Sequence, residues 1–141
     1  MFKHLQSNLQ WRNDLLLRGR YEDLARTFQF PMVVYYGDEL LHLANEDAAQ
    51  TYLRRARHEM MERGVQSCHV KVIAISLPVR GRFKVWAERV YHGTRPEDAF
   101  VSPAVYYMID TPQGLRSEML EFAACSLPIA TTPRKAWSTP F

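Results

Sequence analysis

The fold of this chain of 141 residues is constrained most by a change in hydrophobic periodicity along its sequence, from helical spacing to strand-like alternation. Up to Gly64 most apolar residues recur at helical spacing, whereas from Cys68 onward they alternate with polar residues, as in strands. The alternating runs cover residues 68–77, 82–92, 103–111 and 115–125. The last two are joined by a turn in which Pro112 pre-sets φ and Gly114 accepts a positive φ. The sequence therefore predicts a four-strand antiparallel meander.

Helical segments precede this meander. Leucines at helical spacing predict a first helix over residues 5–17, and a second, short helix over 21–28 is expected to end before Pro31. The composition of residues 32–36 predicts a strand, with 39–43 as its hairpin partner.

A third helix is predicted over residues 45–63. Asn45 is a favourable N-cap, and Gly64 stands where a helix C-terminus commonly has glycine. The predicted fold class is α+β, with the helices of residues 5–28 and 45–63 on the concave side of a strongly bent antiparallel sheet. Residues 1–128 should form a single domain, followed by a Pro-rich tail over residues 129–141.

Composition limits the classes of function. The net charge is +3, but the basic residues are scattered, and the densest group, around Arg55, alternates with acids that can pair with it along a helix. The sequence therefore favours neither a nucleic-acid partner nor, without a long apolar run, a membrane. Cys68 and Cys125 have no metal-ligand spacing and are expected to be buried thiols in a reducing, cytoplasmic compartment.

This succession of elements resembles the nuclear transport factor 2-like superfamily, a cone-shaped α+β fold that includes SnoaL-like cyclases and ketosteroid isomerases. The resemblance covers residues 5–128, and its clearest segments are 21–28, 30–35, 45–48, 85–91 and 106–122. These segments carry element order and packing rather than a catalytic motif, so the resemblance implies a fold that can enclose a small apolar molecule.

The resemblance also implies positions for ketosteroid isomerase chemistry, and this sequence does not have the residues for it. The first-strand carboxylate falls near Tyr35 or Tyr36, the later-strand acid near Val105, and the helix tyrosine near Asn13. Without a carboxylate base no α-proton can be removed, so this mechanism is not carried over.

Arg89 and Glu121 are the first candidates for a site, because each alternates with apolar residues on its strand. An enclosed charge needs a partner or a shifted pKa, so Arg89 could hold an acidic ligand and Glu121 could act as an acid or base. Alternatively, the two side chains pair with each other, or a bulge turns one of them to solvent.

Aromatic and imidazole side chains complete the candidates. Neighbouring residues of a strand point to opposite faces, so one tyrosine of each adjacent pair should face inward. The predicted catalytic residues are Glu121, Tyr36 and His42, and the predicted ligand-binding residues are Arg89, Tyr107, Tyr35, Tyr91 and Trp11. The histidines are isolated, and neither a metal nor a cofactor is predicted.

Two functions follow from these predictions. The first is a SnoaL-like pocket protein for a small apolar or acidic molecule, with acid–base isomerase, cyclase or hydratase activity. The second is a non-catalytic binding module that works through its open sheet face. In either case a homodimer is expected, with outward apolar residues at that face, namely Trp86, Val90, Tyr106 or Leu120.

Overall fold

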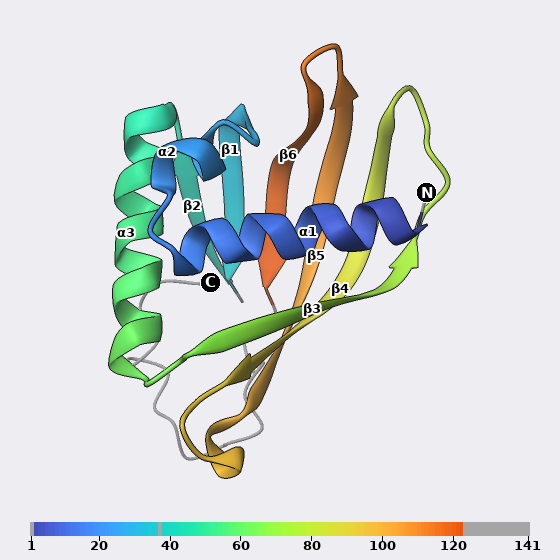
Figure 1. Ribbon diagram of the computed structural model, residues 1–141. Coiled ribbons are helices and arrows are strands. Elements are labelled where there is room, and N and C mark those ends of the chain that lie inside the picture. The colour runs from blue at the N-terminus through green and yellow to red at the C-terminus, as the bar shows by residue number, and fades with distance from the viewer. Residues whose placement is uncertain (1, 37, 123–141) are drawn as a thin grey trace.

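In the computed structural model, which describes residues 2–36 and 38–122, three α-helices lie on one side of a six-stranded sheet (Figure 1). The helices are α1 (Phe2–Leu17), α2 (Tyr21–Ala25) and α3 (Glu46–Glu62). The strands are β1 (Phe28–Tyr36), β2 (Glu39–Leu43), β3 (Ser67–Ile75), β4 (Arg82–His92), β5 (Phe100–Thr111) and β6 (Gly114–Phe122). A 3₁₀ turn, Pro96–Asp98, joins β4 to β5. The predicted cystatin-like α+β cone is confirmed.

The predicted signals at the ends of elements are present. The side chain of Asn45 accepts a 2.9 Å hydrogen bond from the backbone N–H of Ala48, which caps α3. Gly64 follows that helix with φ of 75°, and Gly114 has φ of 108° in the turn between β5 and β6. Both conformations are ones that glycine adopts without steric cost.

The sheet is mixed rather than wholly antiparallel. Its strand order is β2-β1-β6-β5-β4-β3, and β1 runs parallel to β6 while the other neighbours are antiparallel. The first and the last strands of the described chain are therefore neighbours inside the sheet. Parallel partners need a long connection, and here α3 and four strands supply it.

The second helix is shorter than predicted. It ends at Ala25, and β1 already begins at Phe28, so Pro31 lies inside a strand instead of after a helix. The pairing of β1 with β6 shifts register between Phe28 and Val33. Because Pro has no N–H to donate, it is tolerated at such an interruption of the ladder.

A bulge in β6 decides which side chains face the helices. Tyr107 pairs with Met119, but the next residue of β5, Met108, pairs with Ser117, so Glu118 is an extra residue. An extra residue reverses the alternation beyond it.

Two predicted orientations on β6 are therefore wrong: Leu120, expected on the outer face, is buried, and Glu121, expected inside, is exposed. Tyr106 of β5, also expected on the outer face, is buried as well, because it pairs with the buried Val85 of β4 in a ladder without register shifts.

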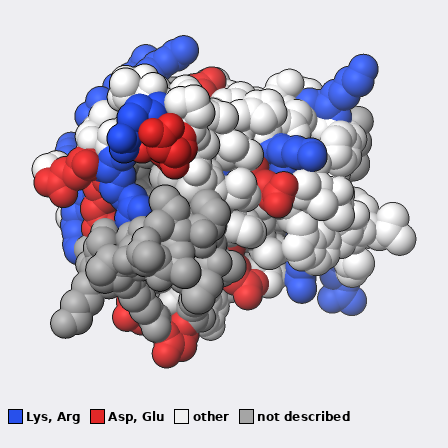
Figure 2. Space-filling model, turned by 90° about the horizontal axis from the view of Figure 1, so that it is seen from below, with Lys and Arg blue, Asp and Glu red and all other residues white. Residues whose placement is uncertain are grey.

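Charged side chains of both signs are interspersed on the side of the molecule where α3 lies (Figure 2). No helix within residues 2–36 and 38–122 is long and apolar enough to cross a membrane. The predictions for Cys125, for the end of the last strand and for the tail fall outside the described residues.

Candidate functional site

A small cavity of about 60 Å³ lies where α1 and α3 meet the concave face of the sheet. Most of its lining is apolar. The lining residues are Leu9, Arg12, Asn13, Leu16, Leu24, Phe28, Tyr52, Leu53, Ala56, Arg89, Tyr106, Ser117, Leu120 and Phe122. At about 15 Å³ for each water, the cavity has room for about four water molecules.

Helix α1 contributes two polar residues to this lining, Arg12 and Asn13. Both lie on the buried stripe of the helix, between Leu9 and Leu16, at steps of three and four residues. Arg12 donates from Nη1 to the hydroxyl of Ser117 and from Nη2 to the carbonyl of Leu115, each at 2.7 Å. These bonds attach α1 to β6, and burial lowers the pKa of Arg12 from 12.5 to about 10, so it stays charged at neutral pH.

Arg89 enters the cavity from β4. Only 5% of it is exposed, and its Nη2 donates a 2.9 Å hydrogen bond to the hydroxyl of Ser102. The guanidinium carbon lies 4.2 Å from the centre of the Phe122 ring and 5.6 Å from that of Tyr91. Contact with aromatic faces partly offsets the cost of burying this cation.

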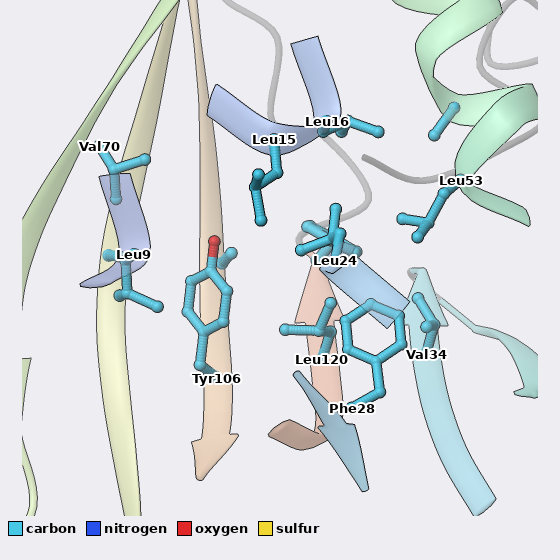
Figure 3. Close-up of a cluster of buried hydrophobic side chains, with 14 of the residues drawn as sticks. Leu9, Leu15, Leu16, Leu24, Phe28, Val34, Leu53, Val70, Tyr106 and Leu120 are labelled. Carbon is cyan, nitrogen blue, oxygen red and sulfur yellow. The ribbon is translucent and has the colours of Figure 1, made fainter. Parts of the chain in front are cut away.

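Tyr106 faces the cavity from β5. Figure 3 shows its ring between Leu9 and Leu120, with the hydroxyl directed toward α1. Burial raises the pKa of Tyr106, so the phenol is protonated at neutral pH and can donate.

Asn13 offers a second donor. It is 7% exposed, and its Nδ2 has no hydrogen-bond acceptor in the described part of the chain. The neighbouring thiol of Cys68 is a weak acceptor and does not replace an oxygen. A buried donor without an acceptor costs about 1–3 kcal/mol, so a bound group that accepts from Asn13 would recover this energy.

The electrostatic character of the cavity follows from this set of side chains. Its lining has two guanidinium groups, an amide and two phenols, and the lining residues include no carboxylate and no imidazole. Burial raises the pKa of Tyr52 as well as that of Tyr106. The cavity is thus rich in donors and suited to an acceptor-rich, negatively charged group.

Of the eight predicted site residues, all of which the structure describes, only Arg89 lines the cavity. Glu121 and Tyr107 lie on the outer face of the sheet, where the Tyr107 hydroxyl donates a 2.9 Å hydrogen bond to Glu121. Tyr107 was expected inside, but Tyr106 faces inward instead, because it pairs with the buried Val85 of β4 in a ladder without register shifts. The predicted pairing of Arg89 with Glu121 does not form, because the two side chains lie on opposite faces.

The other predicted residues are dispersed. His42 and Tyr35 are exposed on β2 and β1, and Trp11 is exposed on the outer side of α1. Tyr36 and Tyr91 face inward and are buried, but neither lines the cavity. Roles in proton transfer for Glu121, Tyr36 and His42 stay predictions.

The sequence did contain a signal for the polar residues that were missed. The α1 stripe runs from Leu5 through Leu9 to Leu16, and its regular steps pass through positions 12 and 13. A charged residue and an amide on an otherwise apolar stripe indicate either a buried polar network or a site. Within the described residues no group of three His, Cys, Asp or Glu side chains is arranged to hold a metal ion.

No protein-family model matches the chain. None of the curated proteins matches it either.

Solved structures do match. A cystatin-like domain of unknown function from Nostoc punctiforme superposes with a TM-score of 0.67 at 13% identity, over 86% of this chain and 75% of that one. A nuclear transport factor 2-like protein with a cystatin-like fold from Novosphingobium aromaticivorans gives 0.64 at 15% identity, over 98% and 88%. A protein provisionally assigned as a scytalone dehydratase from the same organism gives 0.57 at 11% identity, over 85% and 82%. At these identities the matches establish the nuclear transport factor 2-like, cystatin-like fold.

Proposed function

We propose that this chain of nuclear transport factor 2-like fold binds a small carboxylic acid in the cavity between α1, α3 and the sheet. The observation that carries the proposal is the donor-rich lining: Asn13 Nδ2 is buried without an acceptor in the described chain, and the Tyr106 side chain lines the same cavity. Arg12 and Arg89 add positive charge to the same lining. A carboxylate accepts several hydrogen bonds and carries the opposite charge, and its apolar end suits the leucine and phenylalanine walls.

The size of the cavity limits the ligand. About 60 Å³ is far below the ~300–1,000 Å³ of pockets for drug-sized molecules. A steroid or polyketide would need the helices to move apart, whereas an acid of a few carbon atoms would not. The proposed ligand is therefore a short-chain or compact monocarboxylic acid.

Binding is better supported than acid–base catalysis. An isomerase, cyclase or hydratase needs a base near its substrate, and the cavity lining has no carboxylate or imidazole. The raised pKa values of Tyr52 and Tyr106 make these phenols donors rather than bases at neutral pH. The provisional dehydratase among the structural matches keeps hydratase-type chemistry as a weaker proposal, with Tyr106 as its proton donor.

A chain-length series of acids tests the proposal. Calorimetric titration with linear monocarboxylates of two to six carbons should give an affinity optimum, and the matching amides should bind at least about tenfold more weakly, since bonds to charged groups contribute about 1.5–3 kcal/mol. Equal binding of acids and amides, or no binding of any acid at tens of millimolar, would reject a carboxylate site.

Adjacent tyrosines provide a matched pair of variants. Tyr106→Phe removes one hydroxyl at the cavity and should weaken acid binding about tenfold. Tyr107→Phe removes the same atom from the outer face and should leave the affinity within about twofold. If both variants weaken binding equally, the effect comes from the sheet and not from the cavity.

The outer face of the sheet supports a second function, association with another copy of this chain. Residues paired across all six strands form one row on this face: Leu40, Tyr35, Glu121, Val105, Trp86 and Ala74. Trp86, 39% exposed, and Ile73, 49% exposed, are large apolar side chains beside or within the row. Such a face, left open, favours burial against a similar surface.

Light scattering at micromolar concentration tests the homodimer. Trp86→Ser should convert a dimer to a monomer, while Trp11→Ser, which removes an even more exposed tryptophan from α1, should not. A monomeric wild-type protein would reject this second function.

A further inference from the structure

A larger groove, of about 590 Å³, lies on the outside of the molecule. It is bounded by α1 from Asn8 onward, by α2 and by the turn between β5 and β6; in Figure 1, α1 crosses the middle of the picture, and α2 and the turn lie above it. Its lining residues are Asn8, Trp11, Arg12, Leu15, Arg18, Arg20, Asp23, Arg26, Thr27, Gln113, Gly114, Leu115 and Arg116. We call this surface the arginine groove.

The arginine groove has a strong excess of positive charge. Five of its lining residues are arginines, and Asp23 is the one acid among them. Arg20 and Arg26 form ion pairs with Asp23, and Arg26 also pairs with Glu22 on α2 at 2.6 Å.

Arg18 and Arg116 are the arginines that remain for a ligand. Neither forms an ion pair within residues 2–36 and 38–122. Arg116 Nη1 donates to the backbone carbonyl of Phe28 at 3.3 Å, a neutral partner. Because Arg18 directly follows α1 and Arg116 lies on β6, about a hundred positions further along the chain, their clustering is a product of the fold and does not appear as a run in the sequence.

An exposed aromatic side chain stands in the same groove. Trp11 is 48% exposed, and Leu15 and Leu115 provide further apolar lining. An indole face is a good stacking partner for a planar ring. The groove thus combines guanidinium groups with a flat apolar surface.

We propose that the arginine groove binds a small organic phosphate that carries a planar ring, a mononucleotide-like molecule. Arginine forks match phosphate oxygens in geometry and charge, and the ring would lie on Trp11. The volume falls within the ~300–1,000 Å³ of small-molecule sites. This groove is separate from the cavity that we propose binds a carboxylic acid, although the buried Arg12 lines both.

Adenosine monophosphate is the probe. Calorimetric titration of the full chain at low salt should give saturable binding, with inorganic phosphate weaker and adenosine weaker still. The variant Arg18→Gln/Arg116→Gln should lose at least about tenfold in affinity, because it removes the two arginines of the groove that are neither buried, as Arg12 is, nor paired with an acid. Arg55→Gln/Arg80→Gln removes the same charge from exposed positions outside the groove and is the matched control.

Several results would overturn the proposal. Equal losses in the two double variants would mean that net charge, not the groove, attracts the nucleotide. Inorganic phosphate binding as tightly as the nucleotide, or Trp11→Ala leaving nucleotide affinity unchanged, would reject the ring contact. Absence of saturation at several millimolar would reject the site, and circular dichroism of each variant would show that it is folded.

Discussion

Tyr107 and Glu121 are joined by a 2.9 Å hydrogen bond on the outer face of the sheet, away from the cavity that their neighbours Tyr106 and Phe122 line. Burial and the hydrogen bond to Glu121 raise the pKa of Tyr107, so the phenol is the donor. Glu121 therefore lies outside the cavity, and its carboxylate accepts a hydrogen bond on the surface of the sheet.

Glu121→Gln should therefore leave acid binding unchanged and alter the free energy of unfolding by less than about 1 kcal/mol, since exposed polar pairs contribute little. Urea denaturation and the same calorimetric titration check both expectations. A loss of ligand affinity in this variant would mean that Glu121 reaches the bound molecule.

Local signals in the sequence were sufficient for much of the fold. The cap at Asn45, the glycine after α3 and the turn at Gly114 each act within a few residues, and each is found where it was predicted. The parallel pairing of β1 with β6 depends on contacts about ninety residues apart, for which a short sequence window has no signal.

The site was harder to predict than the fold for a related reason. One extra residue, Glu118, reverses the orientation of all that follows in β6, and nothing in the alternation of the sequence marks it. The β4–β5 pairing has no register shift, and the inward orientation of Arg89 was predicted correctly. The burial of Arg12 and Asn13 could have been predicted, because the buried stripe of α1 follows a strict helical period that includes both positions.

Asn45→Ala should lower the free energy of unfolding by about 1 kcal/mol, because the backbone N–H of Ala48 loses its acceptor at the start of α3. Chemical denaturation measures the change. Asn45→Asp keeps an acceptor in the same place and should preserve most of the stability; an equal loss in both variants would argue against the cap.

Cys68 should make stability fall at high pH. Burial raises the pKa of its thiol from 9.0 to about 11, so above pH 9 the unfolded chain releases this proton more readily than the folded one. The free energy of unfolding is unaffected below pH 9 and should decrease by about 2 kcal/mol between pH 9 and 11.

Comparison with Cys68→Ala isolates this effect from the titration of tyrosines. Denaturation at pH 8.5 and at pH 11 should show a smaller decrease in the variant than in the wild-type chain. An identical pH dependence would mean that the thiol ionises as easily in the folded state as in the unfolded one.

Arg12 should be among the most sensitive polar positions in the described chain. Its guanidinium bonds to Asn8, Ser117 and the Leu115 carbonyl, and only 5% of the residue is exposed. Arg12→Met removes the cation but leaves several buried acceptors without a donor, so the free energy of unfolding should fall by about 3–5 kcal/mol. Arg12→Lys keeps the charge but loses the forked donor geometry of the guanidinium, so its free energy of unfolding should lie between those of the wild-type chain and Arg12→Met. Arg18→Met, six residues further along the chain, just after the end of α1 and exposed, should change stability by less than about 0.5 kcal/mol in the same urea titration. If Arg12→Met were as stable as Arg18→Met, the bonds from α1 to β6 would not hold the helix over the cavity.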